Sequence, residues 1–181
     1  MRGMIATVDI AADDSVLDVP FTMMMTLNTA QNGPLQPVVN TKQLTPTNIM
    51  ALHLLNEKFN ASSNFLPWIQ MLPDTFETPM FWSDEELQDL MGSTVYSVTK
   101  KRKQTLTADY NNIFGVLFDE FPALFDKASY TLDAYKWAVS TVWARSFVFN
   151  IDGSQVPVIV PFADMFEHGN VASKFSLSGP S

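Results

Sequence analysis

The chain has 181 residues, 46% hydrophobic and 12% aromatic, so it can bury a core and is too apolar to be disordered. No apolar run approaches the ~18 residues that cross a bilayer, no secretory signal is visible at the N-terminus, and the absence of cysteine excludes disulfides and zinc-thiolate sites. A net charge of −8 argues against non-specific nucleic-acid binding, because phosphate contacts need a basic surface.

Two short β-strands are predicted near the N-terminus. Residues 4–10 have the alternating pattern of a half-buried strand, and residues 16–19 form a second run that Pro20 stops. Two strands this short cannot make a stable sheet alone, so we expect them to pair with a later part of the chain. Residues 28–45 contain Asn, Gln, Gly, Pro and Thr without a clear period and are predicted to be a loop.

Helical signals begin after this loop. Thr45 followed by Pro46 is a good N-cap with proline at the first helical position. Ser83 and Glu86 form a capping box that predicts another helix, and Gly92 is its expected stop.

Two further helices and a strand complete the pattern. A third helix is predicted over residues 106–120, and Thr131 can cap a fourth. Beyond Gly153 the helical pattern gives way to a strand pattern, and residues 156–160 predict a buried strand that ends at Pro161.

This order of elements predicts an α+β fold in which a large helical segment interrupts a small β domain. We expect residues 1–27 to supply N-terminal strands, residues 28–150 a mainly helical insert, and residues 151–181 the start of a C-terminal β part.

The net negative charge of the chain does not identify a partner. The acidity suits a basic protein partner, but it also simply keeps proteins soluble. Residues 100–103 (K-K-R-K) are the one basic cluster of the sequence, and a solvated loop or helix end explains them better than a targeting signal.

Four stretches of the chain are similar to motifs of a known family. Residues 2–7 and 17–20 match the end of a G-x-G-L-x-A-T opening and the V-P that closes a second strand, and residues 65–83 match W-x-P-Y-L-x-x-L-P and T-P-L-x-W. Residues 138–147 match A-x-S-x-V-x-S-R-x-F, and residues 160–168 match V-P-x-A-D-M-x-N-H. In order and spacing, the chain resembles the SET-domain methyltransferases of the Rubisco lysine and actin-histidine methyltransferase type.

The resemblance implies a fold and a reaction. The fold is a β-rich SET domain with a helical insert, and the location is intracellular, whether cytoplasmic, nuclear or plastid. The reaction moves the methyl group of S-adenosyl-L-methionine to a lysine or histidine nitrogen of a protein substrate. Cofactor and substrate enter a narrow channel from opposite sides, so most of the rate gain comes from positioning, and an apolar channel favours the deprotonated amine.

The resemblance also implies a cofactor loop at Arg2, Gly3 and Met4, where glycine lets the backbone approach the ligand. Without the resemblance, a plain strand start is the preferred interpretation of these residues. The family's first glycine is missing, because Met1 stands in its place.

Arg145 follows Trp143 and Ala144 in an apolar helix and needs an anion there. A guanidinium fits a carboxylate bidentately, so the resemblance implies that Arg145 binds the cofactor carboxylate. The alternative is an internal salt bridge to an Asp or Glu.

The segment Asp164, Met165, Phe166, Glu167 and His168 matches the part of the family that wraps the cofactor's amine and adenine. Glu167 replaces the family's asparagine. An asparagine both donates and accepts, whereas an ionised glutamate only accepts. Taken alone, His168 is more typical of a structural histidine.

The family also has a glycine-rich segment whose tyrosine lines the methyl-transfer channel. Nothing after His168 resembles it, so no catalytic residue is assigned. We expect the chain to be the first part of such an enzyme, with little or no methyltransferase activity alone.

Three other functions stay open. A non-catalytic binding module that keeps the SET scaffold would be consistent with Glu167. A metalloenzyme would need His53 and His168, which have no spacing typical of a metal site, and we predict no metal. A purely structural helical protein leaves residues 161–165 (P-F-A-D-M) unexplained.

Overall fold

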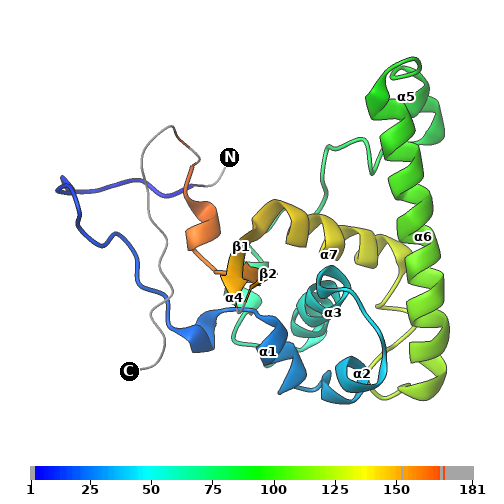
Figure 1. Ribbon diagram of the computed structural model, residues 1–181, viewed down its shortest axis with the longest axis horizontal. Helices are drawn as coiled ribbons and strands as arrows, with labels where there is room; N and C mark the ends of the chain where they lie inside the picture. Colours follow the sequence, from blue (N-terminus) through cyan, green and yellow to red (C-terminus); the bar gives the residue numbers. More distant parts are fainter. Residues whose placement is uncertain (1–2, 152, 168, 170–181) are drawn as a thin grey trace.

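The computed structural model describes residues 3–151, 153–167 and 169. Its elements are η1 (Phe21–Met23), α1 (Leu27–Gln31), α2 (Gln36–Thr41), α3 (Pro46–Phe59), α4 (Leu66–Ile69), α5 (Asp84–Gln88), α6 (Thr94–Glu120), α7 (Leu132–Arg145), β1 (Ser146–Ile151), β2 (Ser154–Ile159) and η2 (Ala163–Met165). Helices form most of the regular secondary structure, and a two-stranded sheet lies at one side of them (Figure 1). The predicted α+β class is confirmed.

The core is built around α3, which packs along α7. The predicted N-caps are confirmed, because the side chains of Thr45 and Thr131 accept hydrogen bonds from the backbone N–H groups of Asn48 and Ala134. All residues from 48 to 55 are buried, so α3 is enclosed on every side. A helix in that position belongs to the centre of the core.

A cluster of aromatic rings joins α6 to α7 and to the loop between them. Phe114 is fully buried at its centre, and its ring has contacts with the rings of Tyr110, Phe118, Phe125, Tyr130 and Tyr135. The hydroxyl of Tyr135 donates a buried hydrogen bond of 2.9 Å to Oδ1 of Asn48. These contacts fix α7 against both α3 and α6.

The third predicted helix begins twelve residues earlier than expected, at Thr94, with Ser93 as its N-cap. The basic run 100–103 interrupts the apolar periodicity, because the first turns of α6 extend beyond the core, beside α5 (Figure 1). The capping box before α5 is confirmed, and Gly92 follows that helix with a φ of 88°.

The prediction of a loop over residues 28–45 is wrong, because α1 and α2 lie there. Thr26 and Thr29 cap α1 reciprocally, so a threonine does what a glutamate or glutamine does in the usual capping box. Pro37 lies in the first turn of α2, where proline is favoured.

The two predicted N-terminal strands are also absent. Residues 4–10 and 16–19 have no strand structure, and Ile5 and Val8 are 88% and 73% exposed. A strand needs a partner backbone, and within the described residues the backbone pairing of β2 with the N-terminal segment is the isolated bridge between Met25 and Ile159.

The C-terminal sheet is an antiparallel hairpin of β1 and β2, in which Ser146 pairs with Ile159 and Ile151 with Ser154. The predicted strand at 156–160 is confirmed except for its last residue, because β2 spans Ser154–Ile159, whereas β1 was not predicted. The chain then leaves β2 for the short helix η2.

Candidate functional site

The short helix η2 begins after an unusual backbone conformation. Phe162 has a φ of 70°, a region that a bulky side chain rarely adopts and that costs free energy. Such strain gathers at functional sites. It turns the chain so that Asp164 points inward, with 1% of its side chain exposed, whereas Phe162 and Phe166 are 45% and 41% exposed.

Two elements far away in the sequence hold Asp164. From α4, the indole N–H of Trp68 donates to both carboxylate oxygens, at 3.1 and 3.2 Å. From the end of α7, Nη1 of Arg145 donates to the backbone carbonyl of Asp164 at 2.9 Å. The same Nη1 lies 3.6 Å from Oδ2 of Asp164 and 3.8 Å from Sδ of Met165.

Burial raises the pKa of Asp164 above its ordinary value, and the Trp68 hydrogen bond and the charge of Arg145 act in the opposite direction. The burial of a carboxylate disfavours its charged form. The charge of the carboxylate is therefore stabilised by Trp68 and Arg145, and further by hydrogen bonds with the backbone of Phe162 and Asp164.

The N-terminal loop lies against the same segment. A Cβ atom at Gly3 would be 3.6 Å from Cγ and Oε1 of Glu167 and 3.7 Å from the carbonyl oxygen of Met165. Glu167 itself is exposed, and Met4 is 44% exposed. Arg2 and His168, which were also predicted to be cofactor-binding, lie outside the described residues.

All four family-like stretches thus meet at residues 163–167. Gly3, Trp68 and Arg145 each come from a different stretch, and each lies beside this segment. Arg145 makes the internal contact that was the alternative to cofactor binding. The role of Trp68 was not predicted, although its position in the second motif was a signal that could have pointed to it.

His53, considered above as a metal ligand, is buried in α3. Its Nε2 lies 3.1 Å from Oγ1 of Thr29, and its Nδ1 lies 3.8 Å from Oε1 of Glu57. The hydroxyl of Thr29 also donates to the carbonyl of Thr26, and the two ring nitrogens of His53 face Thr29 and Glu57. Within residues 3–151, 153–167 and 169, no group of three or more His, Cys, Asp or Glu side chains is placed to hold a metal ion.

The protein should lose stability as the pH falls below 6.5, the ordinary pKa of a histidine. Burial lowers the pKa of His53, and the nearby Glu57 raises it to a smaller extent. Below pH 6.5, His53 therefore binds a proton in the unfolded chain but not in the folded chain, so the free energy of unfolding decreases. Urea unfolding at pH 7.5 and pH 5.5 measures this, and His53→Gln should reduce the difference. An unchanged difference in the variant would contradict the assignment to His53.

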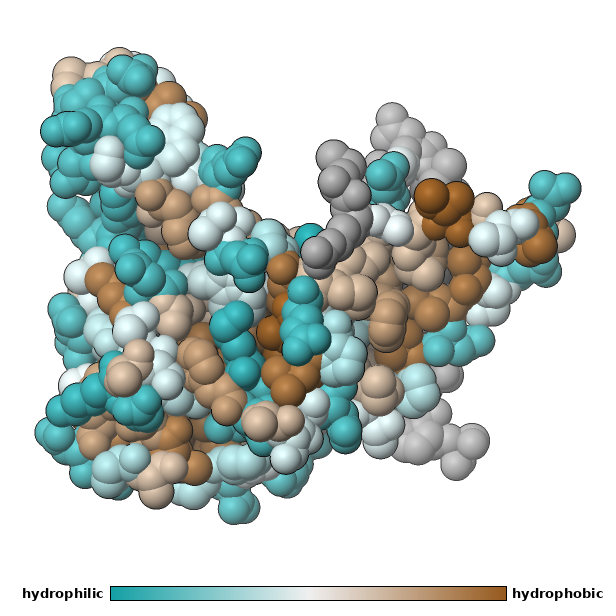
Figure 2. Space-filling model, turned by 180° about the vertical axis from the view of Figure 1, so that it is seen from behind, coloured by the Kyte–Doolittle hydropathy of each residue, from teal (hydrophilic) through white to brown (hydrophobic). Residues whose placement is uncertain are grey.

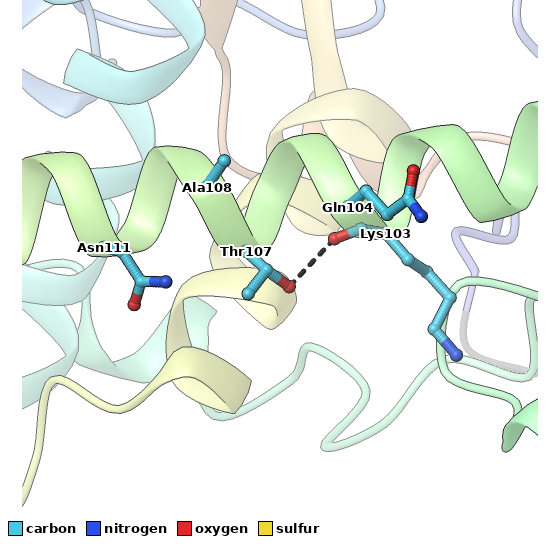
Figure 3. A pocket seen from close by; sticks show the side chains of 5 residues that line it. All are labelled: Lys103, Gln104, Thr107, Ala108 and Asn111. Carbon is cyan, nitrogen blue, oxygen red and sulfur yellow. Dashed lines mark hydrogen bonds between the residues drawn. The ribbon is translucent and has the colours of Figure 1, made fainter.

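Hollows elsewhere on the surface do not resemble a cofactor site. The side chains that line one depression all come from a single helix, α6, and include Lys103, Thr107 and Asn111 (Figure 3). The hydroxyl of Thr107 donates to the carbonyl of Lys103, as is usual within helices. This depression is open and does not include any residue of the 163–167 segment.

Apolar surface gathers on the side of the molecule opposite the outer end of α6 (Figure 2). The exposed apolar side chains of the N-terminal segment are Met4, Ile5, Val8, Ile10, Val16, Leu17, Phe21 and Met23. In the part of the chain that the structure describes, no helix is both long and apolar enough to cross a bilayer.

Comparison with known proteins identifies relatives in sequence and in structure. The chain is 33% identical over 175 residues to the actin-histidine N-methyltransferase of Danio rerio, a match that covers 93% of this chain and 29% of the relative. The crystal structure of the SET domain of LSMT bound to lysine and AdoHcy superposes with a TM-score of 0.81 at 24% identity, covering 95% of this chain and 38% of that one. Rubisco LSMT bound to AdoMet gives a TM-score of 0.78, also at 24% identity, over 93% of this chain and 38% of that one.

No family model matches the chain. The chain spans less than a third of the length of the actin-histidine methyltransferases that it matches, 29% for the Danio rerio protein. The two kinds of comparison nevertheless agree with each other and with the four motifs. The chain is a homologue of the SET-domain protein methyltransferases and has the SET fold.

Proposed function

We propose that this chain forms the cofactor-binding part of an S-adenosyl-L-methionine-dependent protein N-methyltransferase whose acceptor is a lysine or histidine side chain. The observation that carries the proposal is the meeting of Gly3, Trp68 and Arg145 at residues 163–167. This convergence surrounds the segment that the motifs assign to the cofactor with side chains and backbone from the three other stretches. The bound AdoMet and AdoHcy in the structural relatives support the choice of cofactor.

The side chains present fit this cofactor. Within the described residues, the contacts of Arg145 all use Nη1, and a guanidinium has five N–H donors, so donors remain for the cofactor carboxylate. The exposed carboxylate of Glu167 can accept from the cofactor ammonium. The partly exposed ring of Phe166 offers an apolar face to an adenine. When bound, S-adenosyl-L-methionine supplies the methyl group that the acceptor nitrogen attacks.

We propose the same division of the chain as the sequence suggests. Residues 1–27 and 151–181 would belong to the SET part and residues 28–150 to the insert, except that residues 146–150 of β1 go with the SET part because they pair with β2. The bridge between Met25 and Ile159 supports this division, because it joins the two outer segments across the helical one. We also propose an intracellular location and a protein substrate; the relatives named actin-histidine N-methyltransferase support a protein substrate.

Calorimetric titration with S-adenosyl-L-methionine tests the proposal, with adenosine as the control ligand because it lacks the amino-acid group. We expect saturable binding of the cofactor and much weaker binding of adenosine. A folded sample that binds neither ligand, or both equally, would argue for the other candidate, a non-catalytic SET-scaffold module. The replacement of the family's asparagine by the exposed Glu167 is the observation that favours this second candidate.

Replacement of Glu167 by asparagine should tighten cofactor binding by roughly fivefold, because the amide can donate as well as accept, and one hydrogen bond contributes about 1 kcal/mol. The same titration measures the effect. Glu167→Gln is the matched control, since it changes the charge in the same way but keeps the longer side chain. Weaker binding of both variants would instead mean that the negative charge of Glu167 holds the cofactor ammonium.

A further inference from the structure

The helical insert places one side chain directly on the candidate cofactor segment. Trp68 lies in α4, is 2% exposed and belongs to the main core cluster. Its indole N–H points away from that core toward Asp164 and lies within 3.2 Å of both carboxylate oxygens. Its orientation is therefore fixed by the packing of the ring and not by the carboxylate alone.

The chemistry of this contact is selective. An indole N–H can only donate, so it favours a partner that only accepts, which is the ionised form of a carboxylate. Arg145 lies 3.6 Å from the same carboxylate, beyond the usual length of a hydrogen bond. Among the described residues, the side-chain hydrogen bonds to the Asp164 carboxylate therefore come from Trp68.

The hydrogen bond between Trp68 and Asp164 also affects the position of Arg145. The direct hydrogen bond of Arg145 goes to the backbone carbonyl of Asp164, at 2.9 Å. The direction of that carbonyl depends on how the Asp164 side chain is anchored, because both belong to the three-residue helix η2. A short helix of this kind has few internal hydrogen bonds to hold its shape. Trp68, Asp164 and Arg145 thus form a chain of contacts from the insert to the guanidinium.

We propose that Trp68 is a positioning residue for the cofactor site. Its indole holds the Asp164 carboxylate, and the backbone carbonyl of Asp164 in turn orients Arg145. The helical insert therefore contributes to cofactor binding through the α4 indole and not only to the enclosure of the core. This inference rests on the proposed function in one respect, which is that Arg145 binds the cofactor.

The test compares Trp68→Phe with Trp137→Phe. Trp137 is a matched control, because it is also buried and its indole N–H also makes one hydrogen bond, to the carbonyl of Pro73 at 2.8 Å. By calorimetry, Trp68→Phe should weaken S-adenosyl-L-methionine binding roughly tenfold, as expected for one hydrogen bond to a charged group, whereas Trp137→Phe should change it less than about twofold. Equal effects of the two substitutions, or no effect of Trp68→Phe, would overturn the proposal.

A second measurement does not need the cofactor. In a ¹⁵N–¹H spectrum, the indole signal that Trp68→Phe removes should shift with pH as Asp164 ionises, and Asp164→Asn should abolish that shift. Arg145 is the charged side chain in contact with Asp164 within the described residues, and it does not titrate in this range. The Trp137 signal should not follow the same titration. A Trp68 signal that ignores Asp164→Asn would overturn the contact itself, even if the protein binds no cofactor and the proposed function fails.

Discussion

Replacement of Arg145 by alanine should weaken the binding of S-adenosyl-L-methionine roughly a hundredfold, the scale of a bidentate charge-assisted pair. The guanidinium lies at the end of α7, retains 26% exposure, and contacts Asp164 through one of its nitrogens. It is therefore placed both to hold the cofactor segment and to receive an anion from outside. Calorimetric titration of the folded variant measures the loss.

The same substitution should also destabilise the fold. It leaves the buried Asp164 carboxylate without its cation, which costs about 2–3 kcal/mol. Arg145→Lys separates the two effects, because it keeps the charge but loses the planar fork. We expect Arg145→Lys to recover most of the stability and only part of the affinity. Unchanged cofactor binding by Arg145→Ala would mean that Arg145 does not bind the cofactor. Its role would then be the internal salt bridge to Asp164 alone.

The helical core could be predicted from the sequence because its signals are local. Thr45 and Thr131 are followed by helical patterns, and both cap helices as expected. The start of α6 could not be found in this way, because its first turns lie outside the core and need no apolar stripe. Local signals also failed at residues 4–10, where the strand pattern is present but the described part of the chain offers no partner strand.

The candidate site was predicted through motifs and not through physical chemistry. Glu167 and Arg145 were chosen because they occupy family positions, and the sequence alone could not show which anion Arg145 meets. Trp68 lies 96 residues from Asp164, so no local pattern connects them. Only the tertiary fold, which places Trp68 of α4 beside η2, brings the indole to the carboxylate.

The largest loss of stability should come from Phe114→Ala. Phe114 is fully buried, and its ring contacts five other aromatic rings, so its loss leaves a cavity that the rigid rings cannot close. We expect the free energy of unfolding to fall by about 3–5 kcal/mol. Urea denaturation measures it, with Phe21→Ala as the control because Phe21 is 42% exposed and should cost less than about 0.5 kcal/mol. Equal unfolding midpoints for the two variants would contradict the central place of Phe114.

Phe114→Ala also tests whether the aromatic cluster affects cofactor binding or only the stability of the fold. Phe114 packs against the beginning of α7, at Tyr135, whereas Arg145 lies at the other end of that helix. Because distant substitutions act independently, the folded fraction of Phe114→Ala should bind S-adenosyl-L-methionine within about twofold of the original protein. A large loss of affinity in this variant would mean that the aromatic cluster sets the position of Arg145 through α7. Retained affinity would confine the cofactor site to the contacts around Asp164.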